Sequence, residues 1–202
     1  FRSPYGVFFT VYPMLLLGML PKFDRLIASQ FLVSTVINII EVWLLYALFA
    51  PYPLLITLGV FAVFIWHFRL MASTPYFLLG ATGLVTLSTL LHFSSYPDTD
   101  VIAMASYTLV ASLLSVVMAM LLYWFIPEPE PIAAPPAPAK PSAAQINHRT
   151  LLGAILATMS FAVFQMMDLR DSLSAQVATM LVLFPMTYQG SVASALKRCQ
   201  GI

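Results

Sequence analysis

Long apolar segments, interrupted by short polar breaks, make up most of this chain. The hydrocarbon core of a bilayer is about 30 Å thick, and a helix needs about 20 apolar residues to cross it, with roughly 17 to 25 as the working range. The pattern predicts an all-α fold, a polytopic transmembrane helical bundle of about seven spans. These spans cover residues 5–20, 26–50, 54–68, 75–93, 101–126, 151–167 and 173–196.

Composition supports this interpretation. The chain is 60% hydrophobic with a mean hydropathy of +0.90, and only 8% of its residues are charged. An ordinary soluble domain has about 25% charged residues, so a soluble protein is excluded. So few basic residues also argue against nucleic-acid binding.

The lysines and arginines indicate how the helices are oriented. Short loops rich in Lys and Arg stay on the cytoplasmic side of a membrane. If the spans alternate, the breaks after the first, third, fifth and seventh spans share one side, which we expect to be cytoplasmic, and Phe1 lies outside. That side holds seven of the nine basic residues: Lys22, Arg25, Arg69, Lys140, Arg149, Lys197 and Arg198.

An outside Phe1 without a signal peptide leads us to expect a further helix before it. The chain also stops after the basic residues 197–198, where a loop would lead to another helix. We therefore expect an internal fragment of a longer protein. Its parts are the helices of a first repeat over 1–126, a cytoplasmic Pro/Ala-rich linker over 127–149, and the first two helices of a second repeat over 150–202.

The linker has two interpretations. Its proline-rich composition favours an extended, semi-rigid spacer, which would connect the two helical blocks. The same composition would also suit a docking strip for a cytoplasmic partner, and we favour the connector.

A polar stripe follows one face of the second span. Gln30, Ser34, Asn38 and Glu41 recur at spacings of four, four and three, which keeps them within an arc of roughly 80° on a helix. A buried, unpaired carboxylate costs several kcal/mol unless it takes up a proton. We therefore expect Glu41 to couple proton movement to transport, with the stripe as coupling or substrate residues. In the alternative interpretation, Glu41 stays protonated and only forms a hydrogen bond to Asn38 or to a neighbouring helix.

The last span carries further candidates, Gln176 and Thr179, which would face the same cavity as the stripe or hold helices together. Pro13 and Pro185 are helix-break candidates, because each is the centre of an aromatic-Pro-Met triplet in a span with the same direction. Paired broken helices are typical of transporters built from repeats.

Two further groups of residues have packing or interfacial interpretations. His67 and Arg69 are expected at the cytoplasmic end of the third span. Each could relay protons or bind an anionic substrate, but such side chains usually extend to the lipid headgroups. Small side chains on one helix face predict close packing of helices. They are Thr108, Ser112, Ser115 and Ala119 in the fifth span, and Gly153, Ala157 and Ser160 in the sixth.

The order of these features resembles the fusaric acid resistance and aromatic acid exporter superfamily. The features are a basic loop over 22–25, a Pro/Glu break at 126–128, and a helix pair that opens at 148–153 and closes at 195–198. The short linker is similar to that of a compact subfamily of inner-membrane proteins. The resemblance implies two six-helix halves, of which this chain would hold helices two to six and the first two of the second half. It also implies efflux of small aromatic or carboxylate-bearing compounds, with a periplasmic adaptor of the membrane fusion type.

We therefore expect a multi-pass transporter component of the bacterial inner membrane, homo-oligomeric and driven by protons. Zinc-binding, phosphate-binding and nucleophile-elbow motifs are missing, so we expect no catalytic residue, metal or cofactor, and no enzyme. The alternatives are a membrane scaffold that anchors a partner complex, and an intramembrane enzyme for lipid-linked substrates.

Overall fold

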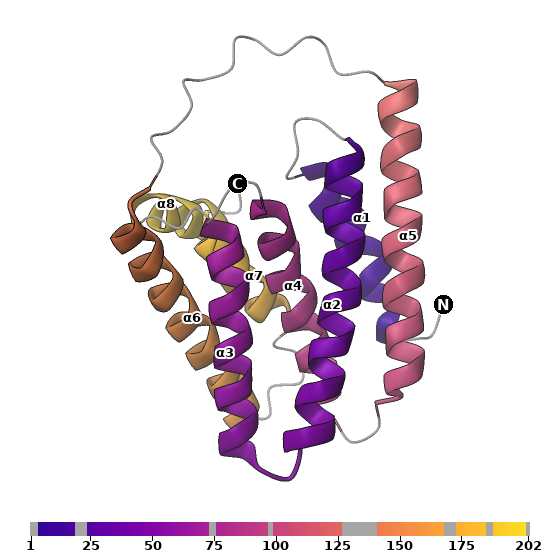
Figure 1. Cartoon of the computed structure of the whole chain (residues 1–202). Coiled ribbons are helices and arrows are strands. Elements are labelled where there is room, and N and C mark those ends of the chain that lie inside the picture. The colour runs from indigo at the N-terminus through magenta and orange to yellow at the C-terminus, as the bar shows by residue number, and fades with distance from the viewer. Residues whose placement is uncertain are drawn as a thin grey trace.

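The computed structural model describes residues 4–18, 24–72, 76–96, 99–126, 141–167, 173–184 and 188–200. Every regular element in these ranges is a helix. A short 3-10 turn, η1 (Pro4–Val7), leads into α1 (Phe8–Gly18). The remaining helices are α2 (Arg25–Phe49), α3 (Pro53–Ala72), α4 (Phe77–Ser94), α5 (Val101–Phe125), α6 (Ala143–Met166), α7 (Leu173–Leu183) and α8 (Tyr188–Cys199) (Figure 1).

Five of these helices, α2 to α6, are long and apolar enough to cross a membrane, and a shorter apolar helix covers Tyr5–Leu17. The prediction of an all-helical fold is therefore confirmed for the described residues, and these long apolar helices are those of a membrane protein by length and composition. The start of α2, the end of α3, the end of α5 and the start of α6 lie at one end of the bundle (Figure 1). These helix ends flank three of the four breaks that we expected on one side of the membrane.

Helix boundaries differ from the predicted ones where a helix extends beyond its apolar part. α3 continues past Arg69 to Ala72, and α6 begins at Ala143 rather than at 151. The early start of α6 follows from a capping box: Gln145 N–H donates to Ser142 Oγ at 3.3 Å, and Ser142 N–H donates to Gln145 Oε1 at 3.0 Å. Residues 143–149, which we had assigned to the linker, are therefore helical.

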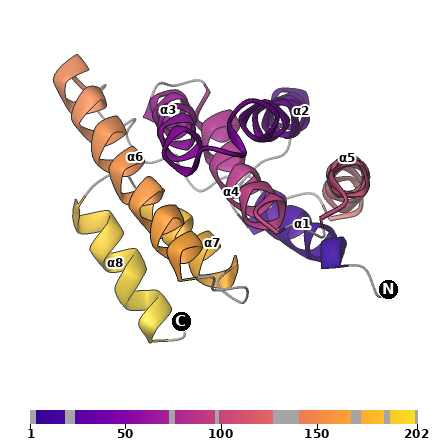
Figure 2. The ribbon, with the colours of Figure 1, turned by 90° about the horizontal axis from the view of Figure 1, so that it is seen from below.

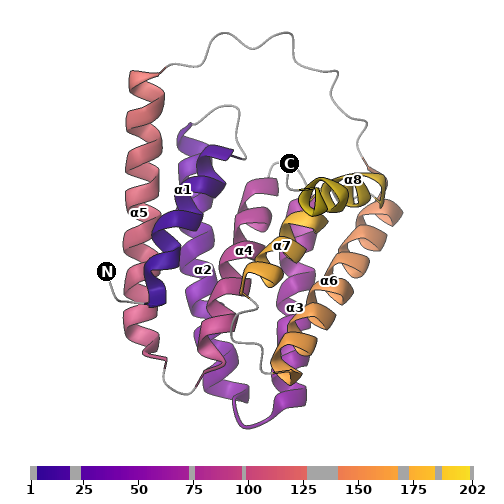
Figure 3. The ribbon, with the colours of Figure 1, turned by 180° about the vertical axis from the view of Figure 1, so that it is seen from behind.

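The single helix expected over 173–196 is wrong. The chain forms α7 and α8 there instead, and Figure 3 shows α8 lying across the end of the bundle while α7 runs along it. Pro185 falls between them, outside the described residues; a proline in a helix interior removes a hydrogen bond and clashes with the preceding turn. Pro13, by contrast, lies inside α1, which continues on both sides of it.

α4 is the central helix. Fourteen of its eighteen residues are buried. Figure 2 shows α4 between α2 and α3 on one side and α1 and α7 on the other. Three of its buried hydroxyl groups need no partner from another helix, because Thr82, Ser88 and Thr89 donate to the carbonyl groups of their own helix at 2.7–2.8 Å. The hydroxyl groups on α4 therefore allow close packing without leaving buried polar groups unpaired.

The predicted small-residue face of α5 is buried, as expected. Thr108 and Ser115 donate to carbonyl groups of their own helix at 2.7 and 2.6 Å. α5 packs with α1 and α2, whereas α6 packs on α3 and α7. On α6, Gly153 and Ala157 are buried, and a Cβ atom at Gly153 would lie 2.7 Å from the ring of Phe68. Both faces thus serve helix packing.

Candidate functional site

An acid from α2 and an imidazole from α3 meet inside the bundle. Glu41 Oε2 lies 3.0 Å from His67 Nε2, which is hydrogen-bond distance and also defines an ion pair if the imidazole is protonated. The side chain of His67 is 0% exposed and that of Glu41 is 17% exposed. The carboxylate that the sequence singled out therefore has a buried partner from a neighbouring helix.

The prediction that His67 lies at the lipid headgroups is wrong. His67 is fully buried, whereas Arg69, two residues further on, is exposed. The helical repeat of about 100° per residue explains this difference, because two successive steps place the two side chains on nearly opposite faces. α3 also continues to Ala72, so His67 is followed by another turn of helix.

Glycines of α4 make room for His67. A Cβ atom at Gly80 would lie 2.5 Å from the carbonyl oxygen of His67. At Gly83 it would lie 2.3 Å from His67 Nδ1 and 3.1 Å from Ser34 Oγ. Real Cβ atoms do not approach other atoms this closely, so the imidazole occupies space that any other residue at position 83 would fill. α2, α3 and α4 therefore meet at this imidazole.

The polar stripe of α2 faces α4. Gln30, Ser34 and Asn38 are all buried. Ser34 Oγ donates to the carbonyl oxygen of Leu79 at 3.1 Å, and Asn38 Nδ2 donates to Ser34 Oγ at 3.3 Å. The structure thus keeps the stripe together on one face and places Glu41 at its end.

Gln30 has a structural role of its own. Its Oε1 accepts from the N–H of Leu79 at 3.1 Å. The first N–H groups of a helix lack partners within the helix, and the residue before α4, Tyr76, provides no side-chain cap. Gln30 therefore caps α4 from a neighbouring helix. The residues that remain as a candidate functional site are Asn38, Glu41 and His67.

Two buried atoms of this group have no hydrogen-bond partner among the described residues: Asn38 Oδ1 and His67 Nδ1. Buried polar atoms are rarely left unpaired, since each costs about 1–3 kcal/mol. Asn38 forms a hydrogen bond with Ser34, and His67 lies beside Gly83. The site is thus incompletely hydrogen-bonded in the state that the structure shows.

The candidates on α7 lie elsewhere. Gln176 is fully buried, but α7 packs on α4 and α6, on the side of α4 away from α2 (Figure 2). Thr179 Oγ1 donates to the carbonyl oxygen of Ala175 at 2.9 Å, within its own helix. Of the helix-break candidates, Pro13 is half-buried in α1 and Pro185 lies outside the described residues. The structure does not group Gln176, Thr179 or Pro13 with Glu41.

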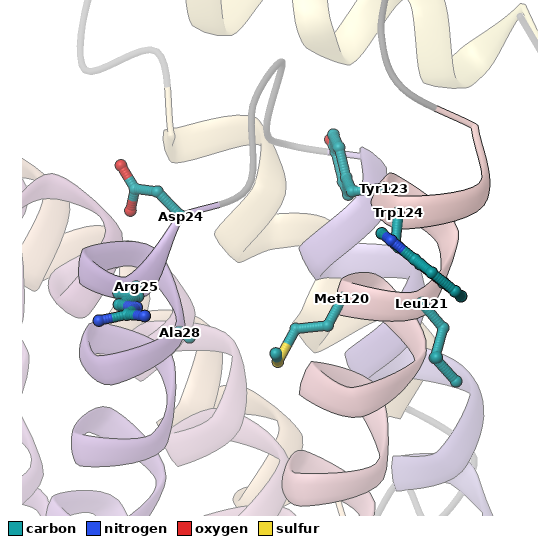
Figure 4. A pocket seen from close by; sticks show the side chains of 7 residues that line it. All are labelled: Asp24, Arg25, Ala28, Met120, Leu121, Tyr123 and Trp124. Atoms are coloured by element: carbon teal, nitrogen blue, oxygen red, sulfur yellow. The ribbon is translucent and has the colours of Figure 1, made fainter.

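A surface cavity of about 510 Å³ lies between the start of α2 and the end of α5. Figure 4 shows Met120 extending from α5 toward α2, while Arg25 lies on the opposite wall. The walls are mainly apolar and aromatic, so an amphiphile could place its apolar body there and an anionic group near Arg25. The lining residues are Asp24, Arg25, Ala28, Met120, Leu121, Tyr123 and Trp124.

This cavity is distant from the Glu41–His67 pair along α2. Sixteen residues separate Arg25 from Glu41, which is about 24 Å at 1.5 Å per helical residue. The cavity and the pair are therefore separate features at different depths of the bundle.

Sequence reasoning missed His67 as the partner of Glu41, and Gly83 as the residue beside it. A signal was present, because His67 is the only titratable side chain between Tyr52 and Arg69. The fourth span also has two glycines three residues apart, at 80 and 83, as expected of a helix that others approach closely.

Comparison with known proteins gives one result. No curated protein and no solved structure matches the chain. A family profile described as "Protein of unknown function (DUF2955)" matches residues 1–122. The match covers α1 to α4 and most of α5, and so includes Glu41, His67 and Gly83. The chain therefore belongs to the DUF2955 family.

Proposed function

We propose that this protein is a component of a proton-coupled efflux transporter, with Glu41 as the coupling residue. The observation that carries the proposal is the Glu41–His67 contact at 3.0 Å between two helices that can cross a membrane. Ionisable groups in the membrane interior are costly and mark ion pathways and proton relays. A purely structural helix contact could be made by uncharged residues at lower cost.

The pair suits coupling because its net charge changes with one proton. Ionised Glu41 beside a neutral imidazole is negative, whereas adding a proton to either group makes the site neutral overall. In an apolar interior these two states differ strongly in their cost of burial. A transporter can use this difference to favour different conformations with and without the proton.

We propose small aromatic or carboxylate-bearing compounds as substrates. The resemblance to the aromatic acid exporters suggests this class. The cavity supports it with the rings of Tyr123 and Trp124 and with Arg25, whose guanidinium shares the lining with the Asp24 carboxylate. An anionic group would be attracted to the guanidinium, and an aromatic ring would stack on or pack against the rings.

The proposed architecture is that of the exporter superfamily. It has the five long apolar helices and the shorter apolar helix of this chain as part of two six-helix repeats, with the linker on the cytoplasmic side of a bacterial inner membrane. A homo-oligomer and a periplasmic adaptor of the membrane fusion type are the proposed partners. The role is transport rather than catalysis, and the driving force is an ion gradient.

A susceptibility screen tests the proposal. A strain that lacks the protein should become sensitive to aromatic acids, and the full-length wild type should restore resistance. Glu41→Gln, which cannot ionise, should fail to restore it at equal membrane abundance. Thr35→Val is the matched control, because Thr35 is a buried polar residue of the same helix but donates to the carbonyl oxygen of Phe31 within that helix.

An unchanged susceptibility profile on deletion would argue for the alternative, a scaffold that anchors a partner complex. Restoration by Glu41→Gln would leave export possible but remove Glu41 from the coupling step. Proteoliposomes with an imposed pH gradient separate these cases, because a proton-coupled exporter would accumulate more substrate than the passive uptake of a weak acid into protein-free liposomes.

A further inference from the structure

We propose that Asn38, Glu41 and His67 form a proton switch, in which Asn38 Oδ1 accepts a hydrogen bond from His67 Nδ1 when the imidazole is protonated. The inference deepens the proposed coupling role of Glu41 by naming the atom that takes up the proton. It accounts for two observations together, the unpartnered atoms of Asn38 and His67.

Ser34 determines which end of the Asn38 amide is free. A serine hydroxyl has a single proton, and Ser34 donates it to the carbonyl oxygen of Leu79 at 3.1 Å. Ser34 Oγ can then only accept from Asn38, so the atom 3.3 Å away must be the NH₂ nitrogen, Nδ2. Asn38 Oδ1 is therefore an acceptor without a donor.

The surroundings of His67 indicate its protonation state in the structure. Nε2 faces the Glu41 carboxylate, whereas Nδ1 faces Gly83 and has no acceptor among the described residues. An N–H group at Nδ1 would be a buried donor without a partner. In the proposed switch, the state before proton uptake is therefore a neutral imidazole that donates from Nε2 to an ionised Glu41 and carries only a lone pair at Nδ1.

Proton uptake changes the net charge and the hydrogen bonding of this pair. A proton from water binds the lone pair of Nδ1, no other bond breaks, and the net charge of the pair rises from −1 to 0. The new N–H group needs an acceptor, and Asn38 Oδ1 is free. Asn38 and Glu41 are three residues apart on one face of α2, and Asn38 bonds to Ser34, which borders Gly83 beside the imidazole.

His67 is 0% exposed and its partner Glu41 is 17% exposed, so in the structure Nδ1 is closed off from water. Gly83 is a positioning residue in this scheme, since a side chain there would push the imidazole away from Glu41.

Other charged groups on the helices around α3 are placed differently. On α3 itself Arg69 is exposed, and on α4 His92 lies in the last turn, at the opposite end from Gly83. On α6, His148 is exposed and Arg149 lies one turn before Gly153, which packs against Phe68. Within the described ranges, Glu41 is the charged residue in contact with His67.

The test is titration of His67 in the full-length protein in nanodiscs, followed by NMR of ring-¹⁵N histidine and assigned by the signals lost in His67→Asn. Asn38→Leu removes the acceptor at similar size and should lower the proton affinity of His67 about tenfold, which is the effect of one lost hydrogen bond. Asn38→Asp supplies a stronger acceptor and should raise it. Thr35→Val is the control, since Thr35 is buried on α2 but bonds to its own backbone at Phe31.

If the proton affinity of His67 is the same in Asn38→Leu, Asn38→Asp and Thr35→Val, the proposed switch is overturned. If Asn38→Leu does not fold, Asn38→Asp alone decides, because an unchanged proton affinity in that variant contradicts the proposed hydrogen bond. The measurement reads protonation and not export. A failed transport assay with the expected titration would therefore overturn the proposed function and leave the switch in place.

Discussion

An ionised carboxylate at the centre of a membrane helix costs about 3 kcal/mol on insertion scales. Such a residue needs a partner that offsets its charge, or a function that requires the charge. Glu41 could be recognised from the sequence, because it is an acid within an apolar span of α2. Its partner could not, since His67 lies 26 residues away on α3 and three helices must meet before the two side chains can touch.

At the residue scale, the pair predicts a specific pattern of stabilities. His67→Gln should lower the unfolding free energy by about 3 kcal/mol, because it leaves a mostly buried carboxylate without its partner. The double variant Glu41→Gln/His67→Gln should be more stable than His67→Gln, since no charge remains to be offset. Thermal unfolding of the purified full-length protein measures both.

Additive losses in this double-mutant cycle would contradict a direct interaction between the two side chains. Thr179→Ala is a suitable control for stability, because it changes a helix residue away from the pair.

At the element scale, two neighbouring helices, α4 and α6, approach α3 closely at glycine residues. Gly80 and Gly83 of α4 approach it at His67 and Met71, and Gly153 of α6 approaches it at Phe68. The predicted small-residue face of α6 indicated close packing, but it did not indicate the partner helix. Which helices are neighbours depends on the whole bundle and not on one helical face.

Substituting Gly153 tests this packing. Gly153→Ala should destabilise the protein by about 1–3 kcal/mol, the usual cost of overpacking, because the new Cβ atom would lie 2.7 Å from the Phe68 ring. Phe68→Leu in the same chain should recover part of the loss by making room. Gly6→Ala is the matched control, since no atom lies within 4 Å of that position.

Melting temperatures in one detergent would compare these variants. A Gly153→Ala protein as stable as Gly6→Ala would show that α6 does not pack on α3 at this point.

At the scale of the whole molecule, the proposed orientation follows from basic residues that share one end of the bundle. Tyr52 lies between α2 and α3, and Ser142 lies before α6, at the opposite end (Figure 1); both are exposed. Their accessibility from the two sides of the membrane therefore tests the topology directly.

In a chain with Cys199→Ser, we expect Tyr52→Cys to react with a membrane-impermeant maleimide in intact cells. Ser142→Cys should react only after the inner membrane is permeabilised. Labelling of both positions from the same side would contradict the alternation of α3, α4 and α5 across the membrane.

The sequence by itself determined the helical, membrane-spanning character of this protein and the polar face of α2. Hydrophobicity and the helical repeat are local properties, and they hold whatever the helices pack against. Only the tertiary structure decided that α4 is central, that His67 is buried beside Glu41, and that residues 173–199 form α7 and α8. These features depend on contacts between residues far apart in the chain, and the free energy of such contacts cannot be read from any one segment.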